Sequence, residues 1–138
     1  MMMLNMLLLL QAAAQPPHAP PTSAVGSVPT DWVALAPMPY IKPPEMTPGL
    51  SSFVAGEIAA GRCPVSRPAD GHYVVKLDVA TLVDTDGIVR RTVPRAIQCP
   101  TVEQYGAGLV ISFARANLRT GAAADQWYRA TVVFDWRG

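Results

Sequence analysis

The sequence predicts an α+β domain in two layers, a three-stranded antiparallel sheet covered by helices in the order helix, strand, strand, helix, strand. Residues 72–83 and 127–136 alternate apolar and polar side chains with the period of two that is typical of strands. Residues 101–118 repeat apolar side chains at helical spacing. An Asp-Gly turn at 84–87 separates the first strand from a second β-branched stretch, which predicts a hairpin.

Two segments precede this domain, which we expect at residues 49–138. Residues 1–10 are apolar except for Asn5, and three alanines follow, so residues 1–14 have the pattern of a cleaved secretory signal peptide. A membrane anchor needs about 20 apolar residues, more than this segment offers. Retention in the inner membrane, facing the periplasm, and a cytosolic protein with an apolar tail are the alternatives. Residues 15–48 are rich in proline, which predicts an extended or disordered linker.

The first element of the domain is predicted to be a short helix. Ser51 or Ser52 is expected to cap its N-terminus, and Gly61 to end it. Its stripe at helical spacing consists of Phe53, Val54, Glu57 and Ile58.

The hairpin follows, with its turn at Asp84-Thr85-Asp86-Gly87, where glycine supplies a positive φ. A calcium loop is the competing interpretation of the two aspartates. It needs further oxygen ligands and a bidentate glutamate, whereas Ile88, Val89 and Arg90 follow here. Pro94 lacks a backbone donor, so the second strand is expected to lie at a sheet edge or to bulge there.

The second helix is expected to cover the sheet. Thr101 and Gln104 match a capping box at its start. Gly106 and Gly108 would each cost about 1 kcal/mol relative to alanine, and a close approach to the strands is the expected compensation. The predicted apolar face consists of Val102, Tyr105, Leu109, Val110, Phe113 and Leu118.

The last strand is expected to run antiparallel beside the first, giving the spatial order second, first, third and leaving the C-terminal strand at an edge. Such an edge can accept an extended segment of a partner, and an inert edge or a dimer contact are the alternatives. Val132→Pro is expected to weaken partner binding, because proline removes a donor. The predicted partner-binding residues are Trp127, Tyr128, Arg129, Ala130, Thr131, Val132, Val133 and Phe134.

The two cysteines, Cys63 and Cys99, flank the open end of the hairpin, and in an exported chain such a pair predicts a disulfide. Zinc is not expected, because a site needs three or four ligands and the nearest imidazole is that of His72. A nucleophilic cysteine would have only the same histidine as a base.

Composition excludes other functions. Eleven basic residues are balanced by ten acidic ones, so no nucleic-acid partner is expected. We find no cluster of titratable side chains, and we therefore predict no catalytic residues, metal or cofactor, and no enzyme.

The segment from Phe53 to Trp136 resembles the C-terminal domain of the energy transducer TonB. The resemblance lies in "VVKLDVATLVDTDGIVRRTVPRAI", in the helix ending in "SFARANL", and in the last strand "WYRATVVFDW". It implies a periplasmic module whose edge strand pairs with a peptide of an outer-membrane receptor, linked to TonB-dependent transport. The alternative is a stand-alone structural envelope protein, as a dimer or a monomer, without a transducing role.

Overall fold

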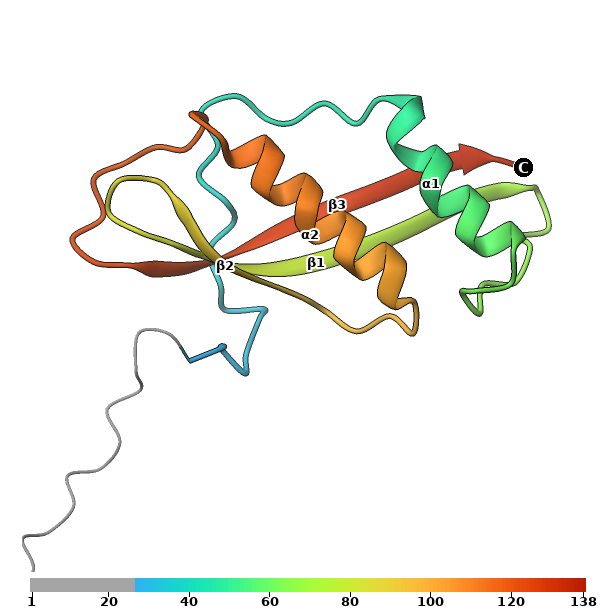
Figure 1. Ribbon diagram of the computed structural model, residues 1–138, viewed down its shortest axis with the longest axis horizontal. Helices are drawn as coiled ribbons and strands as arrows, with labels where there is room; N and C mark the ends of the chain where they lie inside the picture. Colours follow the sequence, from blue (N-terminus) through green and yellow to red (C-terminus); the bar gives the residue numbers. More distant parts are fainter. Residues whose placement is uncertain (1–26) are drawn as a thin grey trace, which may run out of the picture.

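The computed structural model describes residues 27–138 and forms a three-stranded antiparallel sheet with two helices (Figure 1). The strand order is β2-β1-β3, so the predicted fold class and strand order are confirmed. The predicted signal peptide lies outside the described residues. The elements are α1 (Pro48–Ala59), β1 (His72–Val83), β2 (Val89–Pro94), α2 (Pro100–Ala114) and β3 (Gln126–Arg137).

The two neighbours of β1 pair with it over different lengths. β3 pairs along the whole strand without a bulge, from His72 opposite Arg137 to Val83 opposite Gln126. β2 pairs only with residues 79–83 and has a register shift opposite the end of β1. The predicted edge position of β2 is confirmed, and the first half of β1 has no β2 residue beside it.

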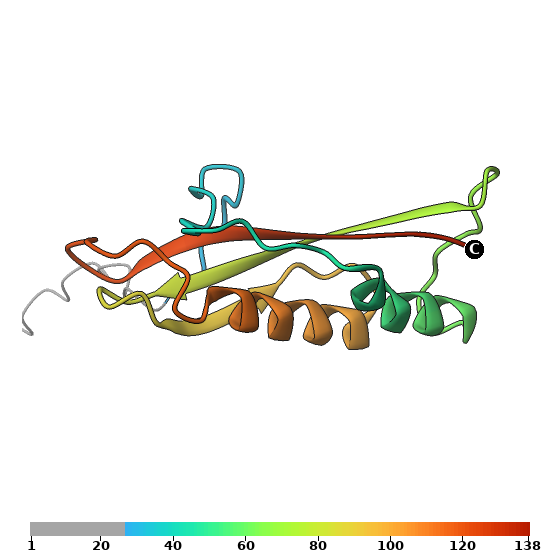
Figure 2. The same cartoon turned by 90° about the horizontal axis from the view of Figure 1, so that it is seen from above.

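Both helices cover one face of the sheet, while residues from the start of the described chain lie on the other face (Figure 2). The helix-facing side chains of β1 and β3 are the apolar members of the alternation seen in the sequence. Together with the helices they form the core. Its largest fully buried side chains are Phe134, Leu77, Val54, Val79, Val102 and Val110.

The opposite face is partly covered by the segment expected to be a linker. Ala80 and Leu82 point away from the helices, yet they are only 0% and 7% exposed. The Arg129 guanidinium, on the residue opposite Ala80, donates to the Trp32 carbonyl at 3.3 Å. The guanidinium of Arg95 lies 5.2 Å from the centre of the Trp32 ring, a cation–π distance.

Residues 36–41, which we call the strap, continue along the domain, with a tight turn at Pro39 where the Tyr40 N–H donates to the Met38 carbonyl at 2.9 Å. The Met38 side chain belongs to the core, and isolated bridges join Pro37 to Arg129 and Tyr40 to Leu118. The prolines leave the N–H groups of intervening residues available, and the Ile41 N–H donates to the Asn117 carbonyl at 2.8 Å. The expected linker therefore packs on the domain before the expected boundary at residue 49.

The expected serine cap of α1 is wrong. The helix begins at Pro48, where a missing N–H costs nothing, and its N-cap residue Thr47 makes no side-chain cap bond. Ser51 therefore lies inside the helix, where its hydroxyl is available to another element. The predicted stop is confirmed, because Gly61 follows the helix with a φ of +74°.

The expected capping box of α2 is also wrong. The Glu103 carboxylate, not Gln104, reaches back to the start of the helix, where it accepts hydrogen bonds from the N–H groups of Ile97 and Cys99 at 3.1 and 3.0 Å. Thr101 instead donates its hydroxyl to Glu57 of α1 at 2.6 Å. The helix begins at Pro100, so the acidic residue in its first turn is the one within reach of the preceding loop.

The predicted turn between β1 and β2 is confirmed. Gly87 has a φ of +78°, and the Asp84 carboxylate accepts the N–H groups of Asp86 and Ile88 at 2.9 and 3.0 Å. Arg90 forms an ion pair with the same carboxylate at 2.6 Å. The hydrogen bond from Ile88, with help from Arg90, holds the pKa of Asp84 below its ordinary value.

Candidate functional site

Cys63 and Cys99 form a disulfide, as predicted, with their Cα atoms 4.9 Å apart. The bond joins the loop after α1 to the residue before α2, and both cysteines are buried. The whole β1–β2 hairpin lies within the covalently closed loop. The bond thus fixes the N-terminus of α2 to the loop that follows α1.

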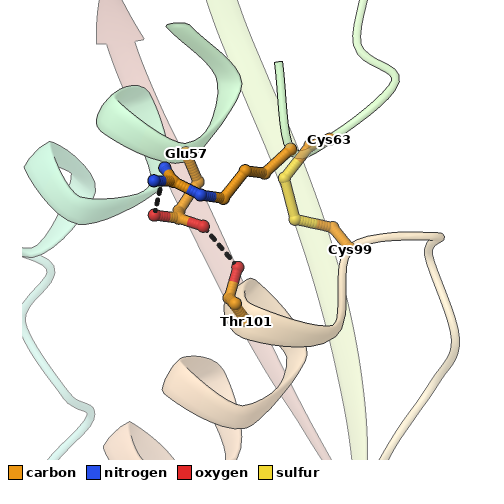
Figure 3. A network of polar contacts seen from close by, with 5 residues as sticks. Glu57, Cys63, Cys99 and Thr101 are labelled. Atoms are coloured by element: carbon orange, nitrogen blue, oxygen red, sulfur yellow. Dashed lines mark hydrogen bonds and ion pairs between the residues drawn. A yellow bond between two sulfur atoms is a disulfide. The ribbon is translucent and has the colours of Figure 1, made fainter. Parts of the chain in front are cut away.

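A polar network beside the disulfide links the two helices (Figure 3). One oxygen of Glu57 accepts from the Arg62 guanidinium at 3.3 Å, and the other accepts from the Thr101 hydroxyl at 2.6 Å. Because both oxygens of this carboxylate have partners, the network explains how α1 and α2 are held end to end, and it needs no ligand.

The outer edge of β3 was the predicted partner-binding site, and its hydrogen-bond directions follow from Arg129. The Arg129 N–H donates to the Ala36 carbonyl at 2.8 Å, and the Arg129 carbonyl accepts from the Met38 N–H at 3.1 Å. Both backbone groups of Arg129 therefore point away from β1. Successive residues of an antiparallel strand alternate in direction, so Thr131, Val133 and Asp135 also point outward.

This edge is covered at two places and open between them. The strap occupies the edge at Arg129, and the Asp135 N–H donates to the Ser51 hydroxyl at 3.1 Å. Between these contacts lie Thr131 and Val133, and no residue of the described chain bonds their outward N–H and C=O groups. The Val133 side chain is 39% exposed. The open stretch is thus two residues long.

Of the eight predicted edge residues, Arg129 points its backbone groups outward but is covered by the strap, and the five from Ala130 to Phe134 divide into two sets. Ala130, Val132 and Phe134 bury their side chains under the helices and direct their backbone groups to β1. Thr131 and Val133 present their backbone groups outward. Thr131 and Val133 are thus the predicted edge residues with outward backbone groups that remain open. Partner binding at this edge stays a prediction.

The strap and Ser51, which limit the open edge, were missed from the sequence. One signal for the strap is the alternation of prolines with Met38 and Tyr40, which gives two apolar side chains the period of a strand. The Ser51 contact has no local signal, since its partner lies 84 residues away.

The remaining polar groups of residues 27–138 do not form a recognisable site. His72 Nε2 lies 2.6 Å from Asp135 Oδ1, a contact that joins β1 to β3 at the surface. Within residues 27–138 no three His, Cys, Asp or Glu side chains are grouped so that they could hold a metal ion. Neither helix of this part of the chain has the length and apolar character needed to cross a membrane.

Models of protein families, curated proteins and solved structures gave no match to this chain. Among the described residues, the open stretch at Thr131 and Val133 is the feature that bears most directly on function.

Proposed function

We propose that this protein is an exported protein-binding module, and that the outer edge of β3 pairs with an extended segment of its partner. The observation that carries the proposal is the pair of residues Thr131 and Val133, whose outward backbone groups have no partner within residues 27–138. Donors and acceptors at this two-residue spacing match the backbone of an extended chain.

The size of the open edge limits what backbone pairing alone can supply. The outward groups of Thr131 and Val133 can form four hydrogen bonds, each with a net contribution of about 0.5–1.5 kcal/mol. Ordering a flexible segment offsets much of this gain. A partner that binds tightly must therefore add contacts to the exposed side chain of Val133 or displace the strap from Arg129.

Export is supported by the disulfide, because such bonds persist in oxidising compartments. The resemblance to the TonB C-terminal domain supports the periplasm as that compartment, and a segment of an outer-membrane receptor as the partner. A link to TonB-dependent transport rests on that resemblance alone. A structural envelope protein that pairs β3 with a second copy of itself is the alternative.

The structure changes the residue at which proline should be tested. The Val132 N–H points to β1, so Val132→Pro would break the sheet instead of the interface. Val133→Pro removes an outward donor and leaves the β1–β3 hydrogen bonds intact. Val133→Thr is the matched control, since it keeps the N–H group and a β-branched side chain.

The test begins with a photo-crosslinking residue placed at Thr131 in cells, with Ile111, an exposed residue of α2, as the control position. We expect a covalent adduct from Thr131 alone, and mass spectrometry identifies the crosslinked peptide. Binding of that synthetic peptide to purified protein is then expected to fall about tenfold in Val133→Pro and to persist in Val133→Thr.

Equal binding by the proline variant and the control would refute pairing at this edge. An adduct between two copies, together with a dimer in light scattering, would support the structural alternative.

A further inference from the structure

The sheet has a second unpaired edge, on the first half of β1. β2 ends at Pro94, the Arg95 N–H donates to the Asp78 carbonyl at 2.8 Å, and the chain then leaves the sheet (Figure 1). Lys76 and Val74 precede Asp78 at two-residue steps, so their backbone groups point to the same side. None of these four N–H and C=O groups has a partner in the described part of the chain.

An apolar cavity of about 220 Å³ lies directly beside this edge. It borders the stretch from Val74 to Lys76 and has the disulfide in its wall. It exists because β2 stops short: the next residues of a longer β2 would have placed a side chain here. Its other lining residues are Val54, Ile58, Val65, Ile97 and Val102.

Lys76 is the one charged residue among those that line the cavity. Lys76 is exposed, and no carboxylate of the described residues lies within ion-pair distance of its ammonium group. Arg67 lines an adjoining cavity that shares Ile58 and Val65 with the first. The nearby Glu57 carboxylate already has Arg62 and Thr101 as partners. An acidic group in a ligand would therefore find a cation here.

We propose that the edge of β1 at Val74 and Lys76, together with this cavity, is a docking site for an extended acidic peptide segment. The segment continues the line of β2, inserts one apolar side chain into the cavity and directs a carboxylate to Lys76. When an extended peptide adds to the edge of a sheet, hydrogen bonds to the unpaired backbone N–H and C=O groups of the strand supply affinity. A pocket for a peptide side chain supplies specificity.

This site is separate from the edge of β3. Lys76 lies opposite Val133 in the sheet, so the two open edges are on opposite sides of the β1–β3 pair. Each proposal can therefore fail while the other holds.

The test is a titration of the isotopically labelled, disulfide-bonded chain with capped heptapeptides, followed by NMR. The probe alternates threonine and leucine and carries one glutamate, and its control carries lysine instead. The glutamate peptide is expected to shift the amide signals of Val74 and Lys76 and the methyl signals of Val65 and Ile97. The lysine peptide is expected to bind more weakly.

Two variants and two modified peptides test the details. Lys76→Glu is expected to weaken binding of the glutamate peptide by roughly three- to tenfold, because an attractive contact becomes repulsive. Lys42→Glu, at another exposed lysine, is expected to leave it unchanged. N-methylation of alternate peptide residues removes the donors of one peptide edge, so one of the two methylation patterns should abolish binding and the other should not.

Three results would overturn the proposal. The first is a titration that leaves the signals of Val74 and Lys76 in place, and the second is a response confined to Thr131 and Val133, which would assign the peptide to β3. The third is a shift at Val74 that depends on protein concentration without peptide, since this would identify a second copy as the occupant.

Discussion

Gly106 lies where α2 packs closely against the sheet. A β carbon at this position would overlap the Leu77 side chain of β1 and lie 3.9 Å from Phe134. Gly108, in the same helix, is exposed and has no atom within 4 Å of the corresponding position. The expected close approach is therefore confirmed at Gly106 and wrong at Gly108, because only the first glycine lies on the buried face.

Alanine at the two glycines is expected to change the free energy of unfolding in opposite directions. Gly106→Ala is expected to lower the free energy of unfolding by about 1–3 kcal/mol, since overpacking of the helix–sheet contact exceeds the gain in helix propensity. Gly108→Ala is expected to raise it by about 0.5–1 kcal/mol. Urea denaturation of the two variants measures both. Stabilisation by Gly106→Ala would mean that Leu77 has room to move away.

At the scale of elements, the strap is the part that the sequence predicted least well. The two long strands were predictable from the alternation of apolar and polar side chains in residues 72–83 and 127–136, because half-buried strands impose a period of two. The strap was not predicted, because its prolines break the patterns by which strands and helices are recognised. Its buried side chain, that of Met38, gives no such pattern on its own. The extent of the open edge of β3 was not predictable either. The strand order could be predicted, but Ala36 and Ser51, which cover the ends of this edge, belong to segments far away in the sequence.

The strap is expected to stabilise the domain through Met38. This side chain is 7% exposed, so Met38→Ala is expected to lower the free energy of unfolding by about 2–4 kcal/mol, through lost burial and the cavity left behind. Ile41 ends the strap and is 59% exposed, so Ile41→Ala should change the free energy of unfolding by less than about 0.5 kcal/mol. Chemical denaturation measures both. Equal effects would show that the strap is not part of the cooperative unit.

At the scale of the whole molecule, the sheet is assembled from distant parts of the chain. β1 pairs with β3 across a separation that ranges from 43 residues at Val83 and Gln126 to 65 at His72 and Arg137, the differences between the paired residue numbers. Such long-range pairing carries a large entropic cost before its contacts form. The disulfide, with a sequence separation of 36, lowers that cost by restricting the unfolded chain.

Removal of the disulfide is therefore expected to act on the whole domain. The double variant Cys63→Ser and Cys99→Ser should lose about 4 kcal/mol of unfolding free energy on the chain-entropy model. Urea denaturation of the variant, and of the native protein with and without reductant, measures this loss. An unchanged midpoint would indicate that the unfolded chain is already compact near the hairpin.

The same bond has a consequence for how the protein matures. The sequence contains two cysteines, so one chain can form a single intramolecular disulfide and has no wrong pairing to correct. Its biogenesis should require a thiol oxidant and be indifferent to the loss of a disulfide isomerase. Cys63 and Cys99 both precede β3, so the covalent ring can close on a nascent chain whose last strand has not yet emerged.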